Sequence, residues 1–128
     1  NGERRTMETY IATMMAKPGH ADAVAKFYAE MEPMLREAPG FHGRKIYQAR
    51  TGTMAAAVRK MYSPEELGKH AEPPHDDPGT LFIMVERWDS VDARLQFSKS
   101  MSSDRSKELI PHLLPEHSHE FYDEVPVD

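Results

Sequence analysis

The chain has 128 residues and no cysteine, and its 16 basic and 21 acidic residues give a net charge of −5. This length suits one domain with a buried core, and the lack of cysteine excludes disulfides, thiol catalysis and thiolate metal sites. The basic residues are scattered along the chain, which argues against a nucleic-acid partner. No apolar run approaches a membrane span, so we expect a cytoplasmic protein with no membrane partner. The polar residues 1–6 predict a disordered leader or tag remnant ahead of a single domain over residues 7–128.

The first third of the chain predicts a strand, a helix and a second strand. Residues 8–15 alternate as a strand does, and the turn Lys17-Pro18-Gly19 ends them. Apolar residues then recur at three- and four-residue steps from 20 to 37, which is typical of an amphipathic helix. Residues 41–50 predict a strand with Phe41 and Tyr47 on one face and Arg44 on the other, unless Gly43 forms a bulge.

Residues 51–79 form an insertion in this pattern. The Ala-rich stretch 54–61 fits a helix and a polar extension of a hairpin equally well. Ser63, Pro64 and Glu66 make a capping box, which predicts a short helix ending near Lys69. A Pro-rich loop follows as far as Gly79. So long a segment needs something to pack on, and we expect it at a subunit boundary or over the mouth of a pocket.

The apolar run 80–85 predicts a central strand that Glu86, Arg87 and Trp88 complete. Alternation along this strand sets two faces, one with Phe82, Met84, Glu86 and Trp88, and the other with Leu81, Ile83, Val85 and Arg87. Ser90 is the expected N-cap of a helix that runs to Ser100 and packs its side chains Leu95 and Phe97.

The last part predicts a helical segment and one more strand. The helical segment begins near Ser103 and carries Leu109, Ile110, Leu113 and Leu114, and residues 118–125 alternate as a strand. The resulting order of two βαβ-like halves predicts an α+β fold of the ferredoxin-like type, a four-stranded antiparallel sheet with helices on one face.

Three short motifs, in this order, carry a family resemblance: Lys17-Pro18-Gly19, Ala38-Pro39-Gly40-Phe41 with Gly43, and Glu86-Arg87-Trp88-Asp89-Ser90. Together they resemble the antibiotic-biosynthesis-monooxygenase (ABM) family of dimeric α+β barrels. The resemblance implies a homodimer whose two sheets pack face to face, with a pocket for a small molecule between sheet and helices in each subunit. Residues 51–79 are much longer than the hairpin turn that is common in this family.

The resemblance also implies activities that range from oxygenation of phenolic or polyketide-like molecules, without metal or flavin, to haem degradation. The haem-degrading pattern has an Asn where this chain has Ala12, and a His near the position of Ser98. Only its Trp matches, as Trp88. The function that we expect is therefore a cofactor-independent monooxygenase for a small aromatic substrate. The alternative is a domain that binds a small molecule without catalysis, or that has a structural role.

Cofactor-free oxygenation needs an apolar pocket, a base, and a polar group that holds the resulting anion. Strand alternation suggests these residues for the pocket walls: Tyr10, Met14, Phe82 and Met84. Trp88, His112 and His119 are the candidate catalytic residues, and Arg44 and Tyr47 are the candidate anion partners. Trp88 fits a place in the core as well as a place in the pocket.

Glu86 and the histidine pair near the C-terminus each have two possible interpretations. Glu86 suits an acid or base if it is buried, but we favour a solvent-facing charge at the strand end, paired with Arg87 or with a helix residue. His117 and His119 share one strand face and could bind a metal, but no third ligand is evident, so we expect no metal site.

Overall fold

In a computed structural model of the chain, residues 7–70, 79–101 and 103–127 are described. The expected leader at residues 1–6 and most of the Pro-rich loop lie outside the described residues. Strands β1 (Glu8–Ala16), β2 (Phe41–Gln48), β3 (Thr80–Trp88) and β4 (Leu113–Tyr122) form one sheet in the order β2-β3-β1-β4. Each neighbouring pair is antiparallel, and β3 is an inner strand as predicted.

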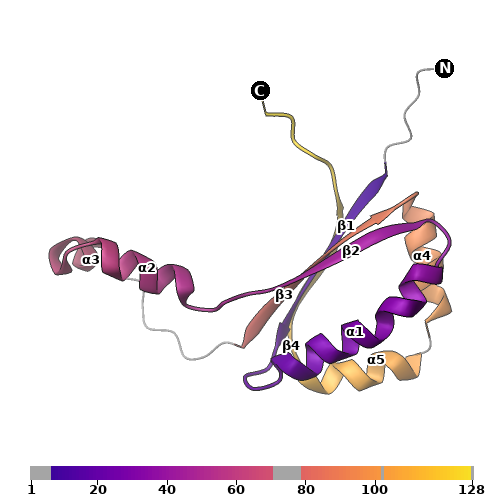
Figure 1. The fold of residues 1–128 in the computed structure, drawn as a ribbon, viewed down its shortest axis with the longest axis horizontal. Coiled ribbons are helices and arrows are strands. Elements are labelled where there is room, and N and C mark those ends of the chain that lie inside the picture. Colours follow the sequence, from indigo (N-terminus) through magenta and orange to yellow (C-terminus); the bar gives the residue numbers. More distant parts are fainter. Residues whose placement is uncertain (1–6, 71–78, 102, 128) are drawn as a thin grey trace.

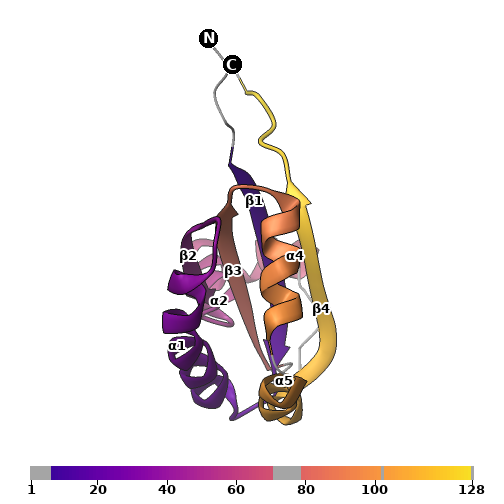
Figure 2. The ribbon, with the colours of Figure 1, turned by 90° about the vertical axis from the view of Figure 1, so that its right-hand side faces the viewer.

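The two faces of the sheet differ as the alternation of β3 predicts. Side chains at Phe82, Met84, Glu86 and Trp88 are buried beneath the helices, while Leu81, Ile83 and Val85 on the opposite face are half-exposed. Figure 2 shows α1 (Ala21–Glu37) and α4 (Val91–Ser100) on the same face of the sheet. The prediction of a ferredoxin-like α+β fold with helices on one face is confirmed.

A bulge in β2 changes which of its residues face the helices. The register with β3 shifts between Phe41, which pairs with Trp88, and Gly43, which pairs with Arg87. Gly43 has a φ of +151°, a region that side chains rarely adopt. The extra residue brings both Phe41 and Arg44 to the helix-facing side and leaves Tyr47 on the open side. Gly43 thus forms the bulge that the sequence left open, and Phe41 and Tyr47 do not share the face expected of a regular strand.

The helix α4 has the predicted N-cap but a different inward face. The Ser90 hydroxyl accepts a hydrogen bond of 3.1 Å from the Ala93 amide, which fixes the start of the helix. Phe97 is buried as expected, but the Leu95 side chain is 52% exposed. Leu95 lies two residues from Phe97, which is more than half a turn around the helix, so Arg94 takes the inward place instead.

The inserted segment forms two helices beyond the end of the sheet, α2 (Thr53–Met61) and α3 (Pro64–His70). The helical alternative for residues 54–61 is thus confirmed. The capping box is also confirmed: the Glu66 amide donates to the Ser63 hydroxyl, and the Ser63 amide donates to the Glu66 carboxylate, each at 3.2 Å. In Figure 1 these helices project away from α1, α4 and α5 (Ser103–Leu109). No residue of α2 is buried.

The last strand begins earlier than the sequence suggests. A 3-10 turn at Ile110–His112 follows α5, and Leu113 and Leu114 then belong to β4 rather than to a helix. The strand ends at Tyr122, before the expected Val125. Pro115 lacks an amide hydrogen, and β4 accommodates it because this strand is an edge of the sheet.

Candidate functional site

A buried carboxylate lies at the centre of the helix-facing side of the sheet. Glu86 is only 2% exposed. Its Oε1 accepts a hydrogen bond of 2.8 Å from Nε1 of Trp88 and lies 2.9 Å from Nε of Arg94. The alternation of β3 places Glu86 between Met84 and Trp88 on this face, and α4 brings Arg94 across from it. Burial of a charge is costly unless it is paired, and both partners here are well placed.

Arg94 lies among aromatic rings. Its guanidinium carbon is 4.4 Å from the ring centroid of Tyr10, 5.5 Å from that of Phe97 and 5.8 Å from that of Trp88. These faces attract a cation and partly replace its hydration. The buried Nε–H of Arg94, although close to Glu86, makes no aligned hydrogen bond with any described residue.

A second arginine approaches the same interior from β2. The Arg44 side chain is 3% exposed, and its Nη2 donates to the Tyr28 carbonyl at 2.8 Å and to the Glu32 carboxylate at 2.7 Å. Its guanidinium carbon is 5.7 Å from the Tyr28 ring centroid. The Nε–H of Arg44 is also buried without an acceptor among the described residues. Each arginine thus has one buried Nε–H that makes no aligned hydrogen bond with a described residue.

Glu86, Arg44 and Arg94 border one inner cavity of about 160 Å³. The rest of its lining is mostly apolar: Phe27, Tyr28, Met31, Leu35, Met84, Phe97, Met101, Ser106, Leu109 and Ile110. Arg94 is paired with Glu86 and Arg44 is paired with Glu32, so the two ion pairs that border the cavity balance in charge. A mostly apolar cavity with a few convergent polar groups is the usual form of a small-molecule site.

The two buried tyrosines near the cavity stay neutral at ordinary pH. Burial raises the pKa of Tyr28 well above its usual range, although Arg44 acts in the opposite direction. Its hydroxyl donates to the Met14 sulfur. Burial also raises the pKa of Tyr10, again against the effect of Arg94. Neither phenol therefore adds a negative charge to the cavity wall at ordinary pH.

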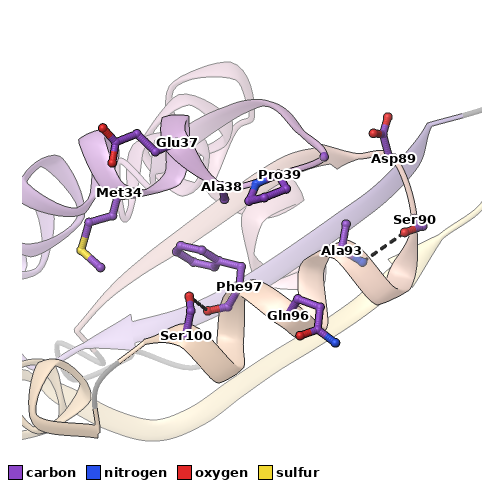
Figure 3. A pocket seen from close by; sticks show the side chains of 11 residues that line it. Met34, Glu37, Ala38, Pro39, Asp89, Ser90, Ala93, Gln96, Phe97 and Ser100 are labelled. Atoms are coloured by element: carbon purple, nitrogen blue, oxygen red, sulfur yellow. Dashed lines mark hydrogen bonds between the residues drawn. The ribbon is translucent and has the colours of Figure 1, made fainter.

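An outer groove of about 720 Å³ runs between α1 and α4 (Figure 3). The end of α1 and the loop after it provide one side, and α4 provides the other. Met34, Ala38 and Pro39 come from the first side, and Ala93, Gln96 and Phe97 from the second. Of the described residues, Phe97 alone lines both this groove and the inner cavity.

The three candidate catalytic residues do not lie together. Trp88 is fully buried, packs against Phe41 and Phe97, and is absent from the described lining of the cavity. His119 is exposed on β4, with its Nδ1 3.4 Å from the Tyr10 hydroxyl. His112 lies at the other end of β1, about 27 Å along the strand from Trp88, where its Nδ1 is 2.9 Å from that of His20.

The candidate binding residues divide between several places. Met84 and Arg44 line the inner cavity. Tyr10 stacks under Arg94, and Met14 contacts Tyr28 through its sulfur. Phe82 and Arg44 border a separate groove between α1 and β2. Tyr47 lies on the open face of the sheet, 53% exposed, so it does not share a site with Arg44.

Sequence reasoning missed Arg94 and Tyr28 and favoured a solvent-facing Glu86. The solvent exposure expected for Glu86 is wrong, because the carboxylate is buried, and its partner is the helix residue Arg94 rather than Arg87. One signal was available: a charged residue within a strict period-2 pattern of large apolar side chains occupies a core position. No such signal identified Arg94, because the Ser90 cap sets where α4 begins and not which of its sides faces the sheet.

Neither a metal centre nor a membrane span is found in the part of the chain that the structure describes. Within residues 7–70, 79–101 and 103–127, no three His, Asp or Glu side chains are arranged to hold a metal ion. His117 and His119 have ring centroids 6.3 Å apart, and His117 contacts the Pro115 carbonyl at 2.9 Å. No helix in the same ranges is long and apolar enough to cross a membrane.

No protein-family model matches the sequence, and no curated protein gives a significant match. Solved structures do match over nearly the whole chain. PA3566 from Pseudomonas aeruginosa is 22% identical with a TM-score of 0.62, and the match covers 98% of this chain and 100% of that one. A putative antibiotic biosynthesis monooxygenase from Nitrosomonas europaea is 11% identical with a TM-score of 0.63, covering 98% and 96%.

A third match is SnoaB, a cofactor-independent oxygenase from Streptomyces nogalater. The chain is 10% identical to it with a TM-score of 0.60, and the match covers 94% of this chain and 95% of that one. At identities this low, the agreement concerns the fold, which this chain shares with all three proteins.

Proposed function

Because the chain has the fold of the antibiotic-biosynthesis-monooxygenase family that its motifs resemble, we propose that it is a cofactor-independent monooxygenase acting on a small aromatic or polyketide-like molecule in the cytoplasm. The observation that carries the proposal is the pairing of Glu86 with Arg94 on the wall of a dry cavity. The fold alone hosts other activities, so the argument rests on these side chains.

Glu86 is the proton acceptor in this proposal. Of the described residues that line the inner cavity, it is the one carboxylate, and its Oε1 is held by Trp88 and Arg94. When a ligand O–H or activated C–H gives its proton to Glu86, the negative charge moves from the carboxylate to the ligand. The net charge of the interior stays constant during this transfer. Arg94 lies beside both positions and stabilises the negative charge before and after it.

Arg94 and Arg44 hold the resulting anion. The buried Nε–H of Arg44 makes no hydrogen bond with any described residue, and that of Arg94 is close to Glu86 without being aligned with it. The held carbanion passes one electron to O₂, and the two radicals combine into a peroxide that takes the proton from Glu86. Loss of water leaves a carbonyl. One CH₂ group and one O₂ thus give one C=O and one H₂O, and the ligand is the only reductant.

Oxygen uptake with anthrone tests this function, since its methylene group is acidic and its oxidation product, anthraquinone, is easily measured. We expect uptake above the buffer rate and one anthraquinone for each O₂ consumed. Glu86→Gln should abolish the excess, while Glu86→Asp should retain part of it. Leu95→Ala is the matched control, because Leu95 lies on the outer side of α4. Equal uptake by wild type, Glu86→Gln and buffer would exclude the proposed reaction.

The alternative is a protein that binds an aromatic anion without oxidising it. The contacts of Glu86 with Trp88 and Arg94 favour this alternative, because both engage the same carboxylate oxygen, Oε1, that would otherwise be open to a ligand. The same assay separates the two functions. Tight binding of a phenolate with no oxygen uptake would support the binding protein.

The resemblance also leads us to propose a homodimer joined through the open face of the sheet. Ile11, Ile83 and Val85 lie side by side there, half-exposed on the side opposite the helices. An apolar face of this kind is typically covered in a stable assembly. We further propose that α2 packs on the partner subunit, because it exposes Met54 and Met61 and contacts little of its own chain.

A further inference from the structure

The inner cavity is too small for a polyketide-like molecule of several rings, the larger kind of substrate in the proposed function. At about 160 Å³ it compares with cavities that hold one benzene ring, whereas sites for larger ligands have about 300–1,000 Å³. The outer groove, about 720 Å³, has ample space, but it lacks the two arginines and Glu86 in its lining. The cavity thus has the groups that would ionise a ligand but lacks room for several rings, and the groove has the room but lacks those groups.

One described residue, Phe97, lies at the boundary between the two spaces. Phe97 belongs to the lining of both, and it is mostly buried in the last turn of α4 (Figure 3). Two contacts hold the Phe97 ring. Its centroid lies 5.8 Å from that of the tilted Trp88 ring and 5.5 Å from the guanidinium carbon of Arg94. Neither contact is a hydrogen bond, so no polar group is left unpaired when the ring turns.

The surroundings of Phe97 leave room for that turn. Two χ1 rotamers are commonly available to an aromatic residue in a helix, and the outer groove offers space into which the ring can move. Met34 and Met101, unbranched and adaptable, line the groove and the cavity respectively. The helix itself ends at the next turn, where the Met101 amide donates to the Phe97 carbonyl at 3.2 Å.

We propose that Phe97 is the gate between groove and cavity and thereby determines the size of the substrate. This inference rests on the proposed function. With Phe97 turned outward, one ring of the substrate enters the inner cavity and brings its acidic group to Glu86 and Arg94. The remaining rings lie in the outer groove against Ala38, Pro39 and Ala93. The substrate class is therefore a fused or linked polycyclic molecule with one acidic terminal ring, longer than a single phenol.

Association kinetics test the gate. Trp88 is the chain's single tryptophan and contacts Phe97, so its fluorescence reports ring movement and ligand entry. Stopped-flow mixing with 1-naphthol, and with anthrone under argon, gives association rates for two- and three-ring probes. We expect Phe97→Ala to bind both about tenfold faster than wild type, because entry no longer waits for a conformational change. Leu95→Ala, on the same helix but exposed, should bind at the wild-type rate.

Three outcomes would overturn the inference. Equal association rates in wild type, Phe97→Ala and Leu95→Ala would exclude a gate, and oxygen uptake by wild type would still support the proposed function. Absence of binding by all three proteins would overturn the gate together with the ligand cavity. If Phe97→Ala does not fold, Phe97→Leu replaces it, with a smaller expected acceleration, and an unchanged rate in that variant also overturns the gate.

Discussion

Nε1 of Trp88 donates a 2.8 Å hydrogen bond to Oε1 of Glu86, two residues earlier on the same strand and on the same face of the sheet. The indole thus supports the buried carboxylate from behind, while Arg94 approaches it from α4. Trp88 positions Glu86 and fills the core, and the described lining of the inner cavity does not include it.

Trp88→Phe should lower the free energy of unfolding by about 1–3 kcal/mol, because it removes a buried donor and leaves unfilled space. Affinity for 1-naphthol should change little. Urea denaturation followed by circular dichroism measures the first quantity, and calorimetry measures the second. Tyr122→Phe, at an exposed position, is the control. A variant with wild-type stability and much weaker binding would place Trp88 in the site instead.

Glu86→Gln and Arg94→Gln should each destabilise the fold by about 3–5 kcal/mol, since each leaves one buried charge without its partner. The double variant should lose less than the sum of the two, with a coupling of about 1–3 kcal/mol. Urea denaturation of the four proteins gives this cycle. Additive losses would mean that the two side chains do not interact in solution.

Stability should fall as pH rises above 10. Burial raises the pKa of Tyr28 and of Tyr10 in the folded protein, whereas both ionise near their ordinary value of 10.0 when unfolded. Above pH 10 the unfolded chain therefore binds fewer protons than the folded protein. The stabilising contribution of the two protonated tyrosines is complete below pH 10 and is lost as the pH rises above it. Chemical denaturation between pH 8 and about 11 should show a gentler decline for Tyr28→Phe. An identical decline would indicate that Tyr28 ionises normally.

Ile83→Asp should dissociate the proposed dimer while leaving the subunit folded, because Ile83 lies on the open face of the sheet, away from the helices. Sedimentation equilibrium at micromolar concentration measures the assembly, and circular dichroism measures the fold. Lys26→Glu changes charge on the exposed side of α1 and serves as the control. A wild-type protein that sediments as a monomer would contradict the dimer.

Replacing Met54 and Met61 together by Gln should weaken the same dimer. These side chains are 77% and 79% exposed on α2, and a nine-residue helix without buried contacts is marginal in water. The dissociation constant from sedimentation is the measurement, with Arg59→Gln on the same helix as the control. An unchanged dissociation constant would show that α2 does not contribute to the dimer interface.

The sequence by itself determined most of the elements and the two faces of β3. The alternation of β3, the Ser90 cap and the capping box at Ser63 act over a few residues, so local rules suffice to predict them. The same is true of the order of strands and helices, from which the ferredoxin-like fold follows. The motifs around Trp88 added the resemblance that the structural matches support at the level of the fold.

Only the tertiary structure decided the site. The bulge at Gly43 turns Arg44 inward and Tyr47 outward, and no local signal fixes whether a glycine in a strand forms a bulge. Arg94 rather than Leu95 lies on the inner side of α4. There it meets a buried counter-charge, Glu86, which belongs to a different element, the strand β3. His119 lies opposite Ala12 in the middle of β1, whereas His112 lies beside Lys17 after its end. Pairing between distant elements sets each of these positions, and periodicity along one element carries no information about its partner.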